Sequence, residues 1–427
     1  MRLRQRCYGS AVMRGLRGAQ WRLLREAAGY RLLFLATLAS SVGTWLAFIA
    51  LVVDVFDRTE DASWVSALLI AEFLPIVVIG ILAGRLIDRV SRRWILVGAD
   101  LARLAVFLVL PFAGSALQIV LLAFVAGVAT SVFRPAVYAG LPNLVSDEEL
   151  PQANGLLQTA DNLTWALGAL AGGALVAATS PDVAYFLNAA SFLVSALLIV
   201  RIRESLQEAE RPPSLGQWRD LLEGLQLAVR SRALLTVLVA WSIVMLANAG
   251  INVAEVFLAK DVFDSGDLGY GVLVSGTGTG LVIGSLLAGP WIAQRGMRVP
   301  YSVSIGLMAI GFGLAAVAPN VWLSTCAVVV GGIGNGVAVV TNAVLVQRGV
   351  PDRLRGRAFS VVMSVGYAVL GIGMVVAGPL TNALGARAVW GIAAALLAVA
   401  AVVGFALLRG VSEERARTEV VPSRHAA

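Results

Sequence analysis

Three acidic side chains interrupt long apolar stretches of this sequence, where an ionised group is energetically expensive. They are Glu72, Asp161 and Glu255. A charge at the centre of a membrane-spanning helix costs about 2.5–3.5 kcal/mol on insertion scales, so each residue needs a partner, water or a proton. Removal from water favours the protonated, neutral form of a carboxyl group. Such a group can carry a proton and release it when its surroundings change. We therefore treat the three as candidates for proton coupling, with a hydrogen bond to a neighbouring helix as the structural alternative.

Two arginines, Arg134 and Arg103, are candidates to balance acidic side chains within the apolar runs. Arg134, close to the inner end of an apolar run, is expected either to balance one of the three carboxylates or to extend toward the membrane surface. Asp100 and Arg103 lie on one face of a helix and are expected to form an ion pair near the cytoplasmic side. We expect this pair to stabilise the fold, and a role in gating is the alternative.

The elements that must hold these residues are membrane-spanning helices. Of the 427 residues, 58% are hydrophobic and 14% are charged, against roughly 25% charged in soluble domains. The apolar runs do not alternate as barrel strands do, and helices satisfy their own backbone in lipid. We predict an all-α membrane protein with twelve transmembrane helices in two pseudo-symmetric six-helix bundles. The predicted spans are 32–53, 64–83, 94–113, 116–138, 156–179, 183–201, 233–257, 269–291, 300–318, 321–346, 358–381 and 386–408.

Charge distribution gives the expected orientation. The net charge is +7, yet the arginines collect in alternate loops, and Lys260 is the sole lysine. This is the pattern of cytoplasmic loops and not of a nucleic-acid-binding surface, so we expect no nucleic acid partner and both termini in the cytoplasm. The expected regions are a tail (1–30), an N-terminal bundle (31–201), a cytoplasmic linker (202–232), a C-terminal bundle (233–408) and a second tail (409–427). The linker is expected to form an amphipathic helix on the membrane surface or a solvated helix.

A shift of 205 positions aligns features of the two halves. It places Gly84 on Gly289, the segment around Asp147 on that around Asp352, and Gly173 on Gly378. Together with the matching hydropathy, this predicts two related bundles that rock around a central cavity.

The loop between the second and third predicted helices carries the most specific motif. It reads Gly84-Arg85-Leu86-Ile87-Asp88-Arg89-Val90-Ser91-Arg92-Arg93. Gly84 permits close helix approach, Asp88 accepts hydrogen bonds, and Arg89, Arg92 and Arg93 hold the loop at the anionic leaflet. The pattern G-x-L-x-D-R-x-x-R-R resembles the loop signature of the major facilitator superfamily, in which this loop latches the two halves. In the second copy Ala293 replaces the acid, so only the first latch is expected to be strong.

The resemblance extends over nearly the whole chain. The segments "EFLPIVVIGILAGRLIDRVSRR", "FRPAVYAGLPNLVSDEELPQANGL" and "GRAFSVV" are similar to the branch that contains macrolide-efflux proteins and the enterobactin exporter. The resemblance implies a proton-driven exporter of drugs or siderophores in the cell (inner) membrane. That branch often carries Gly-Asp in the first helix, where this chain has Gly43-Thr44, so the coupling role of that acid is not transferred.

Aromatic and amide side chains are expected to line the substrate cavity. The leading reading is a proton-coupled antiporter of amphiphilic small molecules that contacts lipid, needs no cofactor and acts as a monomer. The alternatives are an importer or lipid transporter on the same fold, or a membrane sensor without transport; no nucleophile–base pair or metal cluster favours an enzyme. The cavity candidates are Trp45, Arg134, Asn162, Trp165, Asn248, Asn252, Asn335, Asn342 and Tyr367.

Overall fold

The computed structural model describes residues 23–146, 148–206, 231–350 and 355–409. The side chains of residues 76–89, 151, 355–357 and 360 are not described. The linker helix expected within 202–232, most of both tails, and the side chains of Gly84, Asp88 and Arg89 therefore lie outside the described part of the chain.

The described residues fold into long helices. Ten of these are long and apolar enough to cross a membrane, while α3 contributes the shorter apolar segment Ala62–Pro75 and α6 is not among the ten. The chain is thus a multi-span all-helical membrane protein, and the full set of twelve spans stays a prediction. The helices are α2 (Ala28–Thr59), α3 (Ala62–Arg89), α4 (Arg92–Val109), α5 (Ala116–Gly140), α6 (Leu150–Ala178), α7 (Pro181–Val200), α9 (Arg232–Phe257), α10 (Gly266–Arg295), α11 (Arg298–Val317), α12 (Val321–Gly349), α13 (Arg355–Leu384) and α14 (Ala386–Leu407).

Polar residues set where several of these helices begin. The side chains of Ser115, Ser231 and Asn320 each accept a hydrogen bond from a backbone N–H in the first turn of α5, α9 and α12. Such caps satisfy donors that the helix itself leaves unpaired. Several helices are longer than their apolar runs: α2, for example, extends to Thr59 where the run ends at Val53. A helix continues past the hydrocarbon because its backbone bonds do not depend on side-chain polarity.

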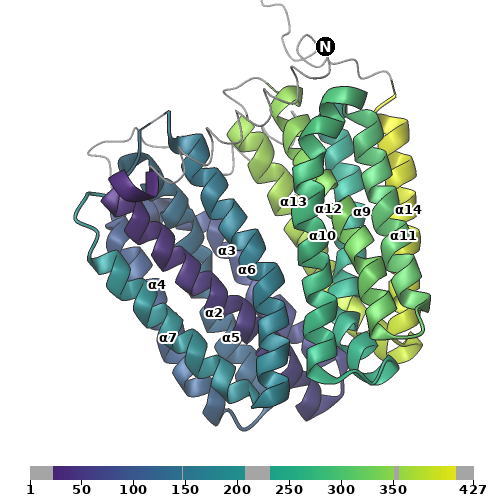
Figure 1. Ribbon diagram of the computed structural model, residues 1–427, viewed down its shortest axis with the longest axis horizontal. Coiled ribbons are helices and arrows are strands. Elements are labelled where there is room, and N and C mark those ends of the chain that lie inside the picture. Colours follow the sequence, from purple (N-terminus) through teal and green to yellow (C-terminus); the bar gives the residue numbers. More distant parts are fainter. Residues whose placement is uncertain (1–22, 147, 207–230, 351–354, 410–427) are drawn as a thin grey trace, which may run out of the picture.

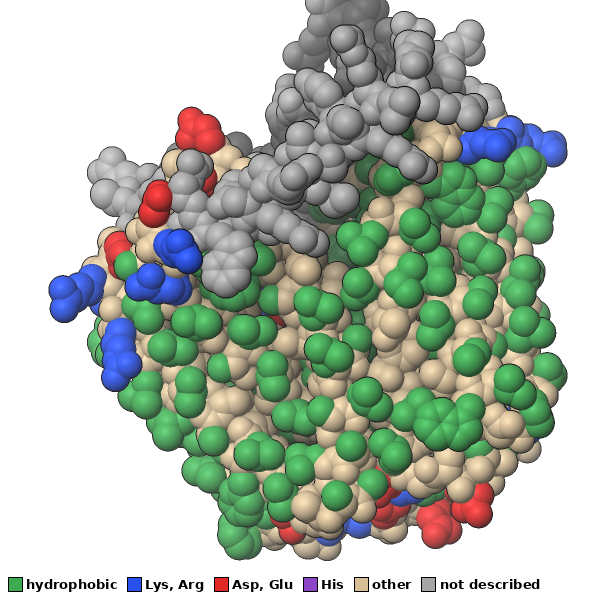
Figure 2. All heavy atoms as spheres, viewed as in Figure 1, with side chains coloured by type: hydrophobic (Ala, Val, Ile, Leu, Met, Phe, Trp, Pro, Cys, Tyr) green, Lys and Arg blue, Asp and Glu red, His purple; other side chains and the backbone are tan. Residues whose placement is uncertain are grey.

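The helices gather in two groups (Figure 1). Helices α2 to α7 form the N-terminal bundle and α9 to α14 the C-terminal bundle. Hydrophobic side chains cover most of the face in Figure 2, and charged side chains lie largely at its two ends. Large apolar side chains are exposed on the described helices, such as Leu286 at 75% and Val402 at 69%. Such a surface suits lipid and not water.

The internal repeat reappears in the packing between the bundles. A shift of 205 positions places α3 on residues 267–294, which is nearly the range of α10 (Gly266–Arg295). The same shift places α6 on residues 355–383, which is nearly the range of α13 (Arg355–Leu384). These pairs make equivalent contacts, α6 with α10 and α13 with α3. Gly173 of α6 packs against the backbone of Asp267 and Gly271, and its repeat partner Gly378 packs against Ala62 and Ser63. The two glycines let the bundles approach at related places.

The polar and ring contacts between the bundles lie at one end. We call it the outer end, because it lies opposite the arginine-rich loops; it carries the α2–α3 turn and the start of α10. Between residues that the structure describes on both sides, every hydrogen bond, ion pair and ring contact that joins the bundles lies there. The opposite, inner end carries the starts of α2, α4 and α6. The molecule is therefore closed at the outer end.

Glycines allow α10 and α12 to pack almost backbone to backbone. A Cβ atom on Gly280 would lie 2.8 Å from the Cα of Gly332, and one on Gly284 would lie 2.0 Å from the carbonyl oxygen of Ile333. No side chain fits at those distances. The four-residue glycine spacing of α10 thus serves close packing within the C-terminal bundle.

Candidate functional site

A small open pocket lies in the N-terminal bundle, toward its inner end. The space that its walls outline, open solvent at the mouth included, is about 240 Å³, and the walls come from α2, α5 and α6. Apolar and polar groups share these walls. The lining residues are Thr37, Phe133, Arg134, Val137, Tyr138, Leu157 and Asp161.

An ion pair between Arg134 and Asp161 crosses this pocket. Asp161 accepts from the guanidinium of Arg134 and, at 2.8 Å, from the hydroxyl of Ser41 on α2. The side chain of Asp161 is 11% exposed, whereas that of Arg134 is 58% exposed. Arg134 is thus the counter-charge of Asp161 and still presents donors to the pocket. Tyr367 of α13 lies within electrostatic range of Arg134, so the C-terminal bundle faces this site.

Glu255 and Glu72 lie on different bundles and share one electrostatic neighbour, Tyr270. Glu255, on α9, is buried, and its Oε1 atom has no hydrogen-bond partner among the described residues. Tyr270 of α10 lies within electrostatic range of both Glu255 and Glu72 of α3. The structure therefore brings two of the three candidate acids to one tyrosine between the bundles, while the third acid, Asp161, is paired elsewhere.

Asp100 and Arg103 form the ion pair expected from their spacing. Arg103 donates to Asp100 at 2.5 Å, and Ser195 of α7 donates to the second carboxylate oxygen at 2.7 Å. The guanidinium lies between the rings of Phe133 and Phe192, 4.3 Å from each centroid. The pair is almost fully buried inside the N-terminal bundle. This environment is that of a structural tie between α4, α5 and α7.

The two described arginines of the loop motif bind carbonyl groups of their own bundle. Arg92 donates to Ala139 and Leu206, at 2.9 and 2.8 Å, and Arg93 donates to Glu204 at 2.9 Å. They hold the ends of α5 and α7 together. These contacts do not join the halves, and the predicted latch between the halves remains a proposal.

The predicted cavity residues are dispersed. Arg134 is the only one that lines the described pocket. Trp45 and Trp165 stack on each other, with ring centroids 5.4 Å apart, and Asn162 accepts a hydrogen bond from Gln158. Asn342 is buried with neither amide atom paired among the described residues. The remaining candidates are half-buried on α9, α12 and α13; they are Asn248, Asn252, Asn335 and Tyr367.

Sequence reasoning missed several residues of the site. Thr37, Ser41 and Tyr138 lie at or beside the Arg134–Asp161 pair. Nothing in their spacing along α2 and α5 distinguishes them from residues that merely pack between helices. Only their proximity to Asp161, on a third helix, identifies them as part of the site. Tyr270 was missed for the same reason, because its relation to Glu255 is purely tertiary.

Comparisons with known proteins agree with this architecture. A family model described as "Transmembrane secretion effector" matches residues 19–425. The multidrug efflux pump Tap of Mycobacterium tuberculosis is 26% identical over 386 residues, 84% of this chain and 88% of that protein. Macrolide efflux protein A of Streptococcus pyogenes is 22% identical over 354 residues, 79% of this chain and 85% of that protein. A crystal structure of a variant of the nucleoside transporter NupG superposes with a TM-score of 0.75 at 14% identity, covering 89% of this chain and 99% of that one.

Proposed function

Because this chain belongs to the transmembrane secretion effector family of the major facilitator superfamily, we propose that it is a proton-coupled exporter of amphiphilic small molecules. Transporters and not enzymes make up the family and these relatives. Two relatives that align with most of the chain are named for efflux, one as a multidrug efflux pump and one as a macrolide efflux protein. We place the substrate of this chain in the same broad class.

The position of the pocket is the observation that carries the proposal. The Arg134–Asp161 pocket lies toward the inner end, and the contacts that join the bundles lie at the outer end. A molecule that enters from the inner end reaches Arg134 and Asp161 while the outer end stays shut. An exporter needs this arrangement in its loading state. Separation of the bundles at the outer end then releases the molecule.

The pocket suits an amphiphile. Phe133, Val137 and Leu157 form an apolar wall that is almost fully buried in this state, while Thr37 and Tyr138 are hydroxyl-bearing residues of the lining. Arg134 adds a guanidinium that is more than half exposed. A few placed polar groups on an apolar wall orient a bulky ligand without requiring many hydrogen bonds.

Glu255 is the proton carrier in this proposal. It is buried and one of its oxygens has no partner among the described residues. An ionised carboxylate in such a place costs several kcal/mol, so the neutral form is favoured while the bundles are closed around it. Separation of the bundles at the outer end changes that environment. Glu72 and Tyr270 lie within electrostatic range of this part of the protein, so we include Glu72 as a second candidate for the proton path.

The energy available is sufficient. One charge that crosses 100 mV gains about 2.3 kcal/mol, so a potential of roughly 150 mV supplies about 3.5 kcal/mol. This supports a concentration ratio of a few hundredfold. We further propose that the protein acts as a monomer in the cell membrane, in contact with lipid and with both termini in the cytoplasm, so that the outer end faces outward.

Substitution of Glu255 with glutamine tests the coupling. In proteoliposomes, Glu255→Gln is expected to keep exchange of labelled substrate at equilibrium but to lose accumulation driven by a pH difference. Glutamine mimics the protonated carboxyl and cannot release a proton. Glu72→Gln is expected to weaken accumulation in the same assay.

Glu148→Gln is the matched control, because Glu148 is exposed outside the helices. It is expected to behave as the unaltered protein does. If Glu255→Gln and Glu72→Gln both accumulate substrate as fast as this control, neither residue carries the coupled proton.

A further inference from the structure

Lys260, the single lysine of the sequence, joins the two bundles at the outer end. It lies in η3 (Leu258–Val262), a short π-helical turn that follows α9. Its Nζ atom donates at 2.5 Å to Asp57 of α2, in the other bundle, and at 2.6 Å to Asp267 of α10, in its own bundle. One ammonium group is therefore shared between one carboxylate of each bundle.

An aromatic pair lies under this ammonium group. The Nζ atom is 4.9 Å from the ring centroid of Phe56, and Phe56 packs edge to face on Phe257 with centroids 4.9 Å apart. The lysine side chain is only 14% exposed. Partial removal from water strengthens both the ion pairs and the cation–π contact relative to an open surface. The cross-bundle contact thus combines an aromatic pair with the ion pairs of one ammonium group.

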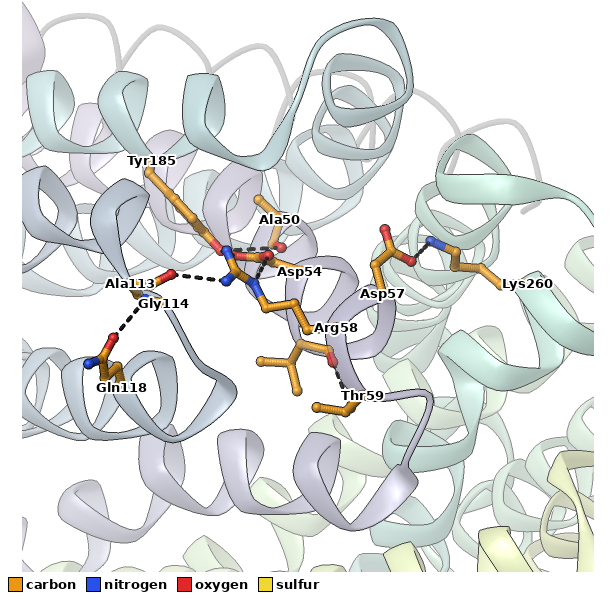
Figure 3. Close-up of polar contacts among 11 residues, drawn as sticks. Ala50, Asp54, Asp57, Arg58, Thr59, Ala113, Gly114, Gln118, Tyr185 and Lys260 are labelled. Carbon is orange, nitrogen blue, oxygen red and sulfur yellow. Dashed lines mark hydrogen bonds and ion pairs between the residues drawn. The ribbon is translucent and has the colours of Figure 1, made fainter.

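The N-terminal side of this contact is rigid (Figure 3). Arg58 pairs with Asp54 at 2.6 Å and donates to the carbonyl of Ala113 at 2.9 Å, while Tyr185 donates to Asp54 at 3.0 Å. These bonds tie the last turns of α2 to the α4–α5 connection and to α7. Asp57 leaves α2 on a different face and points to Lys260. Its carboxylate is therefore presented by a braced helix end.

A second set of cross-bundle contacts is uncharged on the C-terminal side. Asn382 of α13 donates to Asp61 at 2.6 Å and accepts from the backbone N–H of Ala62 at 2.9 Å. Hydrogen bonds from Asn382 and from the backbone of Ser63 hold the pKa of Asp61 below its usual value. Ser66 donates to the carbonyl of Met374 at 2.8 Å. The outer end is closed by this polar seam together with the Lys260 contact.

We propose that Lys260 is the switching element of an outer gate. It bridges Asp57 and Asp267 when the gate is closed, and it keeps Asp267 as its partner when the bundles separate. The reason is the cost of an unpaired, partly buried charge, which is large when no carboxylate remains nearby. Asp57 is 49% exposed, so water solvates it when the pair breaks, whereas Asp267 is 22% exposed. Asp57 thus favours the closed state, and Asp267 lowers the cost of opening.

The two acids are therefore expected to have opposite effects, although both touch the same ammonium group. A merely structural role predicts the same sign for both. This inference rests on the proposed alternation between closed and open outer ends, but it requires neither the substrate nor proton coupling. Its test is therefore independent of transport.

Maleimide labelling of a buried reporter measures opening directly. Ser66→Cys serves as the reporter, because Ser66 is 3% exposed beneath α13. The background carries Cys7→Ser and Cys326→Ser, and the full-length protein is held in nanodiscs so that the reagent reaches both faces. Asp57→Asn and Lys260→Met are each expected to raise the labelling rate about two- to fivefold, the size of effect seen for partly exposed ion pairs.

Asp267→Asn is the matched control, with the same change of side chain and of net charge. It is expected to leave the labelling rate unchanged or lower. The variant Asp57→Asn/Lys260→Met is expected to label no faster than the faster single variant, because both remove one interaction. Equal acceleration by Asp57→Asn and Asp267→Asn, or no acceleration by Asp57→Asn, would overturn the proposal.

Discussion

Replacing Arg103 with leucine is expected to destabilise the protein by about 3–5 kcal/mol, because it leaves the buried Asp100 without its counter-charge. Asp100 is 0% exposed. Its remaining described donor is the hydroxyl of Ser195, which cannot neutralise a carboxylate. Arg103→Leu also removes the guanidinium from between Phe133 and Phe192 and loosens the contact of α4 with α5 and α7. Unfolding with SDS in mixed micelles, followed by tryptophan fluorescence, measures the change.

The double variant Asp100→Leu/Arg103→Leu separates the unpaired charge from the loss of packing. Replacement of a whole buried pair by apolar groups is often close to neutral. The double variant is therefore expected to be more stable than Arg103→Leu alone. Ser195→Ala is expected to cost only about 0.5–1.5 kcal/mol, as for one hydrogen bond. If the double variant is less stable than Arg103→Leu, the pair stabilises the bundle through its charges and not merely through its packing.

Replacing Arg134 with leucine is expected to lower substrate affinity and efflux at least tenfold. The variant loses the donors that face the pocket and leaves Asp161 with Ser41 as its described partner. Hydrogen bonds to charged groups contribute about 1.5–3 kcal/mol, and a factor of ten corresponds to about 1.4 kcal/mol. Binding of a labelled macrolide to the purified protein, with efflux from cells that express it, measures both effects.

Two arginine variants serve as controls for Arg134. Arg134→Lys keeps the charge but loses the planar fork of donors, so an intermediate loss is expected. Arg298→Gln removes an arginine that stacks on Phe405 far from the pocket, and it is expected to bind and export normally. Unchanged binding by Arg134→Leu would exclude the pocket as the substrate site.

Helix positions were predictable from the sequence, because lipid demands continuous apolar runs and internally paired backbones. The run 321–346 corresponds to α12 and the run 300–318 to α11, within a few residues. The ends were less accurate. α2 continues to Thr59 through Asp54, Asp57 and Arg58, since each of these polar residues pairs with a group on a neighbouring segment instead of ending the helix.

The site was only partly predictable. Asp100 and Arg103 were paired correctly, because three residues along a helix bring side chains together. Arg134 and Asp161 are 27 positions apart, and the sequence offered Arg134 as a counter-charge without saying for which acid. Only the tertiary arrangement of α5 and α6 around the pocket decides this.

Lys260 is the clearest miss. The sequence marks it as the single lysine, and it was used only to describe the distribution of basic residues. Its partner Asp57 is 203 positions away. Asp57 follows the predicted span 32–53 and Lys260 follows the predicted span 233–257, so the two residues belong to different predicted loops. A contact between two bundles leaves no periodic signal in either.

Direction of transport tests the central claim most directly. We predict that inverted membrane vesicles, with the cytoplasmic face outward, accumulate a labelled macrolide when their lumen is made acidic, and that a protonophore abolishes the accumulation. The Glu255→Gln protein is expected to accumulate none. Proton-driven accumulation by right-side-out vesicles instead, with none in inverted vesicles, would contradict export.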